Sequence, residues 1–298
     1  MNRKIIYIIN PISGTRTKND IRQIIEAKTG QKEIAYSIFP SVANGDYSFL
    51  RSIIKEEKVT DVVVAGGDGT ISQVAGSLMN EKLNFGIIPC GSGNGLAFAA
   101  KIPKQPEKAL NIIFKGHASE IDGFYVNKTF ACMLCGLGFD GKVAHEFSKQ
   151  PTRGLATYAR LISKNFFFAN PYRFALESNG REFTTEAFFI SIANSNQFGN
   201  NFTIAPKALL SDGLLDIVIA KKTVKPFLLF NVLKQIWSGK LQNIKNSLNQ
   251  PIIYFQTDKI NIGNIDHAPM HIDGDPAETP EKLEIEVKKK CFRLIQPA

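Results

Sequence analysis

The stretch Asp61-Val-Val-Val-Ala-Gly-Gly-Asp-Gly-Thr70 decides how the rest of this 298-residue sequence is interpreted. The β-branched run Val62–Ala65 predicts a short buried strand, and the run Ile71–Met79 predicts a helix. The glycine loop Gly66–Thr70 between them would present backbone N–H groups to an anion. Its single acid, Asp68, suits a metal ion or a substrate hydroxyl beside a phosphate. The alternative is an ordinary Gly/Asp turn, but several glycines around one acid favour a binding loop.

The sequence on both sides of this stretch alternates between predicted strands and helices. The predicted elements are strand Lys4–Ile9, helix Lys18–Lys28, strand Glu33–Phe39, helix Asp46–Glu57, strand Phe85–Ile88, helix Pro106–Phe114 and strand Glu120–Val126. This alternation predicts a doubly wound parallel sheet, in which ligands bind beyond the carboxyl ends of the strands. Polar glycine loops at residues 10–14, 66–70 and 91–95 would meet at that edge. Their convergence indicates a nucleotide site.

The pattern changes near Asn127 to short strands interrupted by two helical stretches. The predicted strands are Thr129–Leu134, Tyr172–Glu177, Ala187–Ala193, Leu215–Ala220, Ile252–Phe255, Lys259–Ile262 and Leu283–Val287, and the helical stretches are Gly154–Phe167 and Lys225–Ser238. We therefore predict two domains, an α/β nucleotide domain (residues 1–127 with 288–298) and a β-sandwich (residues 128–287). The last apolar run, Cys291–Ile295, is expected to return to the first domain.

The composition favours an anionic partner in a reducing compartment. The net charge is +9, from 36 Lys+Arg and 27 Asp+Glu, but no dense basic block indicates nucleic acid. The four cysteines are sparse, and the pair Cys132 and Cys135 has no second pair to complete a zinc site, so buried strand positions are the better interpretation. The sequence has no signal peptide pattern and no apolar run near the roughly 20 residues of a membrane span. We expect a cytoplasmic protein that touches a membrane only peripherally.

Several familiar motifs are absent or misplaced. The sequence contains no G-x-x-x-x-G-K-[ST], which excludes a P-loop NTPase. A G-x-G-x-x-G at Gly136, Gly138 and Gly141 lacks the acid expected about 20 residues later, so we interpret it as accidental for dinucleotides. His267 and His271 are separated by Pro269, which argues against a helical metal-binding pair and favours neutral surface or strand histidines.

Six motifs together resemble those of the diacylglycerol kinase and sphingosine kinase superfamily. In chain order they are Asn10-Pro-x-Ser-Gly14, Gly66-Gly-Asp-Gly-Thr70, Pro89-x-Gly-Ser-Gly-Asn94, Gly136-x-Gly-Phe-Asp140, Pro206-Lys-Ala-x-x-x-Asp212-Gly-Leu-Leu-Asp216 and Asp273-Gly-Asp275. They cover nearly the whole chain. The resemblance implies an ATP-dependent lipid kinase with an α/β nucleotide domain followed by a β-sandwich lipid domain.

The resemblance also implies roles for individual residues. The implied nucleotide-binding residues are Asn10, Ser13, Gly14, Ser41, Gly66, Gly67, Asp68, Gly69, Thr70, Ile71, Ser72, Gly91, Ser92, Gly93 and Asn94. Asp275 stands where the family has a catalytic glutamate, with Asp273 to orient it and Asp68 as a second candidate base. Asp140 would contact the substrate, and Leu209, Asp212 and Leu214 resemble a structural magnesium site. Asp122 is a further candidate ligand for the Mg²⁺ that bridges the phosphates.

The expected reaction is attack of a lipid hydroxyl on the γ-phosphate of ATP, with Mg²⁺ and a carboxylate base. The Gly-Ser-Gly-Asn sequence of residues 91–94 is closer to sphingoid-base and ceramide kinases than to many bacterial diacylglycerol kinases, so the lipid stays open. Two alternatives also stay open. An NAD kinase shares the Gly-Gly-Asp-Gly-Thr motif, and a catalytically silent nucleotide- or lipid-binding regulator would explain the shortened acid at Asp275.

The helical stretch 154–167 suggests how the lipid is reached. Its predicted core face consists of Leu155, Tyr158, Ala159, Ile162 and Phe166. Arg153, Arg160 and Lys164 lie on other faces, Phe166-Phe-Phe168 follows, and no acid occurs between Glu146 and Glu177. Basic residues beside exposed aromatics suit transient docking on an anionic bilayer. The second helical stretch, with Phe227, Phe230 and Trp237, is expected to assist, and a homodimer stays open.

Overall fold

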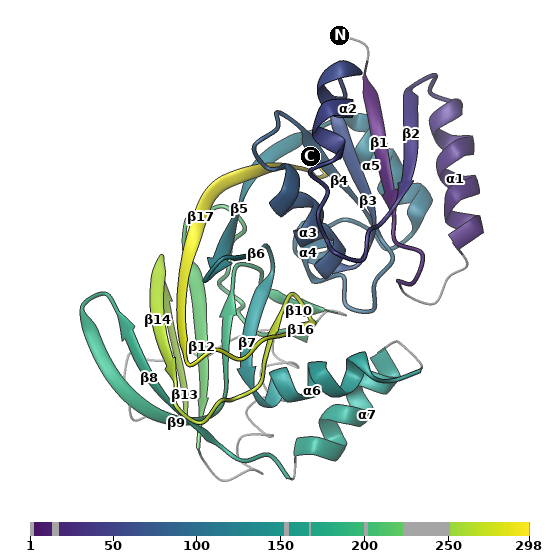
Figure 1. The fold of residues 1–298 in the computed structure, drawn as a ribbon. Coiled ribbons are helices and arrows are strands. Elements are labelled where there is room, and N and C mark those ends of the chain that lie inside the picture. The colour runs from purple at the N-terminus through teal and green to yellow at the C-terminus, as the bar shows by residue number, and fades with distance from the viewer. Residues whose placement is uncertain are drawn as a thin grey trace.

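The computed structural model describes residues 3–13, 18–151, 155–166, 168–199, 202–222 and 251–297. These residues form an α/β lobe and a β-rich lobe, which are joined by the long strands β5 and β17 (Figure 1). The α/β lobe contains β1 (Lys4–Ile9), α1 (Lys18–Gly30), β2 (Ala35–Pro40), α2 (Leu50–Glu56), β3 (Asp61–Gly66), α3 (Asp68–Leu78), β4 (Asn84–Pro89), α4 (Gly95–Ala99), α5 (Pro106–Lys115) and β5 (Ala118–Val126).

The sheet of the α/β lobe is parallel and covered by helices on both faces. Its strands lie in the order β2-β1-β3-β4, and each neighbouring pair is parallel. Successive side chains of β1 point to opposite faces. Ile5 and Tyr7 pack with Ile21 of α1, whereas Ile6 and Ile8 belong to the core that contains α2 and α3. The doubly wound sheet predicted from the alternating pattern is confirmed.

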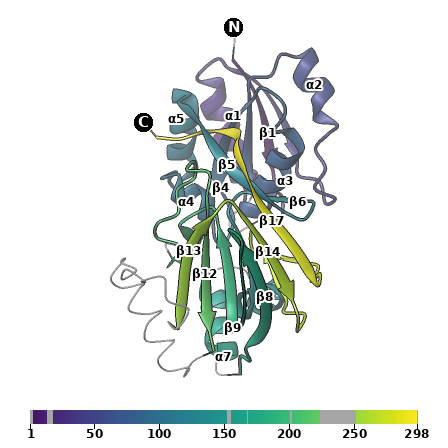
Figure 2. The ribbon, with the colours of Figure 1, turned by 90° about the vertical axis from the view of Figure 1, so that its left-hand side faces the viewer.

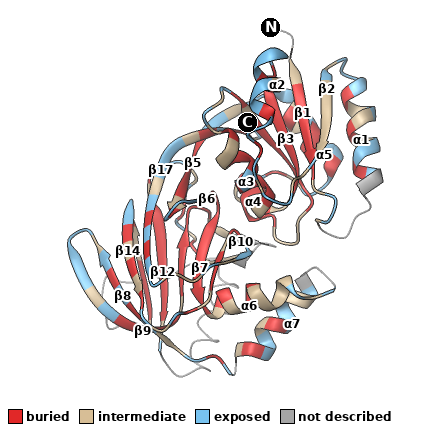
Figure 3. Ribbon diagram, in the orientation of Figure 1, coloured by how far each residue is buried: buried red, intermediate tan, exposed pale blue. Residues whose placement is uncertain are grey.

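The β-rich lobe is built from antiparallel strands, and its buried apolar side chains form two clusters. Its elements are β6 (Thr129–Ala131), β7 (Leu134–Gly138), α6 (Phe139–Ser148), α7 (Leu155–Phe166), β8 (Tyr172–Ser178), β9 (Arg181–Ala193), β10 (Gln197–Gly199), β11 (Phe202–Thr203), β12 (Leu215–Lys221), β13 (Ile252–Thr257), β14 (Lys259–Asn264), β15 (Met270–Ile272), β16 (Asp275–Ala277) and β17 (Lys282–Ile295). The first half of β9 pairs with β8, and its second half pairs with both β7 and β12. Strands β8, β9, β12 and β13 lie side by side in Figure 2. The inward-facing residues of these strands, such as Phe174, Ile190 and Ile217, are fully buried (Figure 3).

Strand β17 is shared by the two lobes. Its first part pairs with β14 and β5, and after an irregularity between Lys288 and Phe292 its last part runs parallel to β4, with Arg293 opposite Asn84. The expected return of Cys291–Ile295 to the first sheet is therefore confirmed. The domain division stays a prediction, and its boundary at residue 288 falls inside this continuous strand.

Several predicted element boundaries were wrong. Helix α3 begins at Asp68 rather than Ile71, because an acid is favourable in the first turn of a helix. The run Thr129–Leu134 is divided between β6 and β7. Helices α4 and α6 and strands β15 and β16 were missed, since short or glycine-containing segments carry little periodicity. The predicted helix 225–238 lies outside the described residues. Within the described ranges, no helix is long and apolar enough to cross a membrane.

Candidate active site

Two glycine loops pack backbone to backbone at the carboxyl ends of β3 and β4. A Cβ atom built on Gly91 would lie only 2.5 Å from the Cα atom of Gly67. Position 91 therefore needs glycine to let the loops approach, and a Cβ atom on Gly67 would also be in tight contact, 3.2 Å from the Gly91 Cα atom. Because α3 begins at Asp68, directly after Gly67, the unpaired amides of its first turn lie beside this contact. Such a helix terminus attracts anions.

Asn94 and Asn10 fix the shapes of the neighbouring loops. Asn94 adopts a left-handed backbone conformation (φ 55°), and its side chain accepts a hydrogen bond from the Gly91 amide (2.7 Å) and donates one to the Gly91 carbonyl (2.8 Å). Asn10 donates to the Thr70 hydroxyl (2.8 Å), which ties the first loop to α3. The loops predicted to converge are thus brought together.

The remaining predicted nucleotide residues are distributed around the same edge. The Ser13 hydroxyl donates to the Asn10 carbonyl (3.3 Å), and the Ser41 amide donates to the Ile9 carbonyl (2.9 Å) at the end of β2. Ser92 and Gly93 lie in the loop that Asn94 shapes. Gly14 lies outside the described residues.

The side chains of Ile71 and Ser72 point into the interior of the protein and away from the glycine loops. Ile71 is buried in the core beneath the sheet, and the Ser72 hydroxyl donates a hydrogen bond to Asp273 and lies 3.0 Å from the Cys132 sulfur. These two residues could contribute to nucleotide binding only through their backbone atoms. Their side chains instead anchor α3 to the lobes' cores.

Asp68 is buried, and both of its carboxylate oxygens are already hydrogen-bonded. The backbone amides of Gly95 and Leu96, in the first turn of α4, donate to Oδ2 (3.0 Å) and Oδ1 (3.1 Å). Burial raises the pKa of Asp68 to about 6, although the two amides oppose that rise. Asp68 therefore joins the start of α3 to the start of α4, a role that the sequence did not reveal.

Asp273 is a second buried acid, and it connects the two lobes. Its Oδ1 accepts hydrogen bonds from the amides of Met133 (3.0 Å) and Leu134 (2.8 Å), and its Oδ2 accepts one from Cys132 (3.0 Å) as well as from Ser72. Burial raises the pKa of the Asp273 carboxyl. With its oxygens bonded to protein donors, Asp273 is arranged to hold the turn in place. Its expected role in orienting the base stays a prediction.

Asp275 is the exposed acid of the same turn and lies against α3. A Cβ atom built on Gly69 would lie 2.0 Å from Asp275 Oδ2, so the carboxylate contacts the glycine in the first turn of the helix. Asp273 and Gly274, both with positive φ angles (49° and 86°), form the tight turn that brings Asp275 there. The two acid-bearing glycine motifs, 66–70 and 273–275, therefore meet across the lobes.

Asp140 lies at the start of α6, close to this turn but buried. Its Oδ1 accepts a hydrogen bond from the Gly141 amide (2.9 Å), and its Oδ2 lies 3.5 Å from Nε2 of His271. His271 is a strand histidine, as predicted, within β15. Its position beside Asp140 was not foreseen, and no local pattern could have indicated it.

Leu209, Asp212 and Leu214 of the predicted metal ligands lie in one loop, whereas Asp122 lies in β5. Leu209 and Asp212 are exposed, and Asp212 Oδ1 accepts a hydrogen bond from the Leu214 amide (3.1 Å). Asp122 is fully buried, and its two oxygens accept hydrogen bonds from the amides of Gly213 (2.7 Å) and Lys290 (2.6 Å). In the part of the chain that the structure describes, no group of three His, Cys, Asp or Glu residues could hold a metal ion. A cation at this turn would be held by Asp212 and carbonyl oxygens, which are ligands that Mg²⁺ accepts.

Helix α7 packs through a face that matches the predicted one only in part: Tyr158 and Phe166 contact aromatic rings of α6, as expected for a core face. Leu161 and Asn165 are its buried residues, and the Asn165 amide donates to Glu146 of α6 (2.7 Å). Ala159, expected on the core face, is exposed. The reason is that α7 packs against α6 at the edge of the lobe, and this single contact selects positions 161 and 165. Arg153 and the side chain of Leu155 lie outside the described residues.

Comparison with known proteins agrees with this arrangement. Residues 4–126 match the diacylglycerol kinase catalytic domain, and residues 134–296 match the YegS C-terminal NAD kinase beta sandwich-like domain. A YegS-like protein of Pectobacterium atrosepticum, named a probable lipid kinase, is 29% identical over 297 residues, which cover 96% of this chain and 94% of the relative. A diacylglycerol kinase of Staphylococcus carnosus is 22% identical, with 92% and 89% covered. The crystal structure of a diacylglycerol kinase from Bacillus anthracis superposes with a TM-score of 0.73 at 21% identity, with 99% and 97% covered, and so shares the fold.

Proposed function

Because the chain belongs to the lipid kinase family that joins a diacylglycerol kinase catalytic domain to a YegS-type C-terminal domain, we propose that it uses ATP and Mg²⁺ to phosphorylate a lipid hydroxyl. The acceptor that we propose carries an unesterified hydroxyl at its polar end, as diacylglycerol and sphingoid bases do. The relative from Staphylococcus carnosus that is named a diacylglycerol kinase supports the first of these. The Gly-Ser-Gly-Asn sequence of residues 91–94 supports the second.

One contact carries the proposal, namely that of the Asp275 carboxylate with Gly69 at the start of α3. Amides at a helix start hold phosphate groups, and a carboxylate beside them can take the proton from an attacking hydroxyl. Phosphoryl transfer depends mainly on positioning and charge neutralisation, with a residue that orients the nucleophile. We therefore assign Asp275 as the base. Asp68 and Asp273 hold the surrounding backbone.

We propose that the two glycine loops, 66–70 and 91–94, hold the ATP phosphates through their backbone amides, with Asn10, Ser13 and Ser41 at the rim. The carboxylates of Asp273 and Asp275 add to the effect of burial in raising the pKa of Asp68, which indicates a concentration of negative charge. Negative charge beside the phosphate loops favours the binding of a cation such as Mg²⁺. When bound, the ion would neutralise phosphate charge, and the exposed Asp275 is the acid best able to reach it. The turn at Asp212 remains our proposal for a separate structural magnesium ion.

A turnover assay tests the proposal directly. The purified chain is supplied with labelled ATP and Mg²⁺ and offered diacylglycerol, a sphingoid base, ceramide or NAD. We expect label on one of the lipids and none on NAD. Label on NAD would show that the protein is an NAD kinase and would contradict the proposal. Binding of nucleotide and lipid without any turnover would identify a silent regulator.

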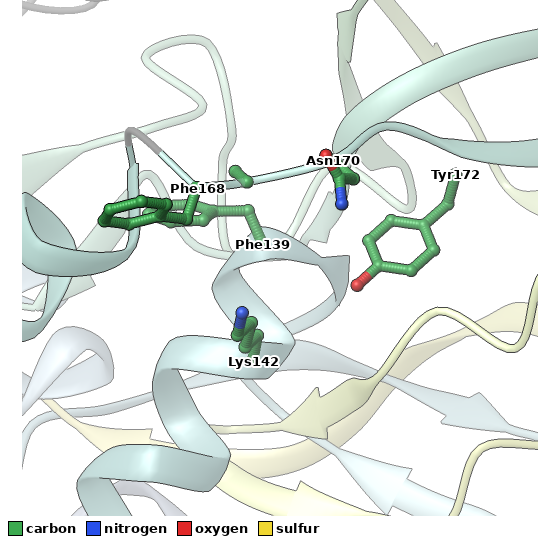
Figure 4. Close-up of a pocket in the computed structure, with 6 residues that line it drawn as sticks. Phe139, Lys142, Phe168, Asn170 and Tyr172 are labelled. Carbon is green, nitrogen blue, oxygen red and sulfur yellow. The ribbon is translucent and has the colours of Figure 1, made fainter.

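We also propose that the edge of the β-rich lobe docks on an anionic membrane surface. The Phe168 side chain is 77% exposed directly after α7, and Arg160 and Lys164 are exposed on that helix. Phe139, Phe168, Lys142, Asn170 and Tyr172 surround a small pocket there, with the amine of Lys142 and the phenol of Tyr172 directed toward it (Figure 4). Among the described ion pairs, none involves Lys142, Arg160 or Lys164. Unpaired cations beside aromatic rings suit anionic headgroups.

Vesicle co-sedimentation tests this docking surface. Each basic residue near an anionic surface contributes about 1 kcal/mol, so the variant Arg160→Gln/Lys164→Gln should bind anionic vesicles about 10- to 30-fold more weakly. Lys104→Gln/Lys108→Gln, which removes the same charge from exposed positions of the α/β lobe, is the matched control. Equal losses in the two variants would show that net charge, and not this surface, drives binding.

A further inference from the structure

Helix α6 is attached to the hairpin formed by β15 and β16, whose turn carries Asp275. The Gly138 amide donates to the Pro269 carbonyl (2.8 Å), and a Cβ atom on Gly141 would lie 2.1 Å from the same oxygen. Nε2 of His145 lies 2.9 Å from the Met270 carbonyl oxygen. The start of α6 therefore packs directly on the backbone that leads into the Asp273–Asp275 turn.

His271 is positioned to connect this helix to the turn. Its Nδ1 accepts a hydrogen bond from the Gly274 amide (3.3 Å), and its Nε2 lies 3.5 Å from Asp140 Oδ2. The side chains of His271 and Asp140 are only 2% and 9% exposed. Because Nδ1 accepts a hydrogen bond, a neutral imidazole must carry its proton on Nε2, which faces the carboxylate. The ring thus has one donor and one acceptor, each directed at a suitable partner.

Gly136 makes room for this pair. It lies directly opposite His271 in the pairing of β7 with β15. A Cβ atom on Gly136 would lie 2.1 Å from Asp140 Oδ2 and 2.5 Å from His271 Nε2. Any larger residue would separate the acid from the histidine. This accounts for the first glycine of the Gly136-x-Gly-Phe-Asp140 motif, which a dinucleotide interpretation left unexplained.

We propose that Asp140 and His271 are a pair of positioning residues that hold the Asp273–Asp275 turn so that Asp275 meets Gly69. In this arrangement Asp140 orients His271, and His271 holds the Gly274 amide. Asp140 therefore acts through the turn and does not contact the lipid, which differs from the substrate role expected from the sequence. The inference rests on the proposed role of Asp275 as the base.

The hydrogen bond of His271 to Gly274 and its approach to Asp140 can be removed separately. Asparagine at this position can place its carbonyl oxygen near Nδ1 and keep the bond to Gly274, whereas glutamine can place its amide nitrogen near Nε2 and keep the approach to Asp140. His271→Phe removes both. Since misplacement of a catalytic group by about 1 Å can cost about 100-fold, we expect His271→Phe to lower kcat by about 10- to 100-fold, with KM for ATP and lipid changed by less than about twofold. His271→Asn should lose less activity than His271→Gln, and the exposed His267→Gln is the control.

If Asp140 instead contacted the lipid, its substitution would raise the lipid KM and leave kcat unchanged. Asp140→Ala removes the carboxylate that faces the histidine, so kcat should fall as it does in His271→Phe, while the lipid KM changes by less than about twofold. A rise in the lipid KM with kcat unchanged would overturn the proposal. So would His271→Phe with unaltered kcat.

Nitrogen-15 NMR tests the pair without any turnover, which separates this inference from the proposed function. The chain has 4 histidines, and the His271 signals are those lost in His271→Gln. We expect a protonated Nε2 and an unprotonated Nδ1 for His271 at neutral pH, with the Nε2 signal shifted in Asp140→Ala. A protonated Nδ1, or an Nε2 signal that does not shift in Asp140→Ala, would overturn the proposed pairing of Asp140 with His271. This would hold even if the enzyme phosphorylates lipids as proposed.

Discussion

At the scale of the residue, the acids of the site are distinguished by their burial and by the amides that hold the buried ones. Asp68 accepts hydrogen bonds from two backbone amides of α4. Asp273 accepts hydrogen bonds from three backbone amides of the β-rich lobe and from the Ser72 hydroxyl. Asp275 is exposed and contacts Gly69. An acid whose oxygens are held by several amides stabilises a backbone, whereas an exposed acid beside a helix start can exchange a proton with a substrate. The division of roles follows from these surroundings.

Asp275→Asn should leave the fold intact and nearly abolish turnover. The loss of a general base costs about 100- to 10,000-fold in kcat, and asparagine keeps the size of the side chain while removing the proton acceptor. Asp275→Glu restores a carboxylate and should retain more activity than Asp275→Asn. Steady-state kinetics with the lipid identified above measures both. Equal turnover by Asp275→Asn and the wild type would remove Asp275 from the mechanism.

The buried Asp68 should make the stability of the protein depend on pH. Burial raises its pKa from 3.8 to about 6, so the folded protein binds more protons than the unfolded chain between these values. The contribution of Asp68 to the free energy of unfolding is therefore present at low pH and falls as the pH rises through this window. Relative to Asp68→Asn, which cannot ionise, the wild type should lose about 2–3 kcal/mol between pH 4 and 6.5. Urea denaturation of the two proteins checks this, and parallel pH curves would contradict it.

At the scale of the element, the start of α3 is shaped by contacts between loops. The close approach of Gly67 and Gly91 brings the carboxyl ends of β3 and β4 together, and Asn94 closes the second loop on itself. The helix start and the loop then form one anion-binding surface.

Gly91→Ala should therefore weaken both stability and ATP binding. Its Cβ would lie 2.5 Å from the Gly67 backbone, and relieving this overlap should cost about 1–3 kcal/mol of unfolding free energy. Gly30→Ala is the control, because nothing lies within 4 Å of a Cβ there. Thermal denaturation and nucleotide titration of both variants measure the effect. If the two alanines behave alike, the loops do not pack as described.

At the scale of the whole molecule, the lobes are joined by a shared strand and by buried acids. β17 pairs with β14 in one lobe and with β4 in the other. Asp122 accepts hydrogen bonds from the backbone amides of Gly213 and Lys290. Asp273 links α3 to the start of β7 through its hydrogen bonds with Ser72 and Leu134. The site lies where these connections meet. We therefore expect the two lobes to unfold together.

Phe292→Ala should destabilise both lobes at once. Phe292 is 3% exposed and makes edge contacts with Phe85 (centroid distance 5.4 Å) and Phe130 (6.4 Å). Truncating a buried phenylalanine costs about 3–5 kcal/mol. Hydrogen exchange should show faster opening of β3 and β9 alike, whereas the exposed Phe168→Ala should change neither. Faster exchange in β3 alone would mean that the lobes unfold independently.

The elements that were predicted correctly are those with strong local patterns. The β-branched strand Val62–Ala65 and the alternating elements around it appear as expected, because buried strands and amphipathic helices are encoded by neighbouring residues. The glycine loops were found for the same reason. The short strands β15 and β16 were missed, since three residues carry no measurable period.

The sequence by itself determined the fold class, the glycine loops and the acids that could serve the chemistry. Only the tertiary structure decided which acid does what. Ser72 and Asp273 are separated by 201 residues in sequence, and Asp140 and His271 also lie far apart along the chain, yet each pair is in contact. Such contacts depend on how whole elements pack, and no periodicity along the chain records them. The burial and the hydrogen bonds that set the pKa of Asp68 are properties of that packing. The exposure of Asp275 is another.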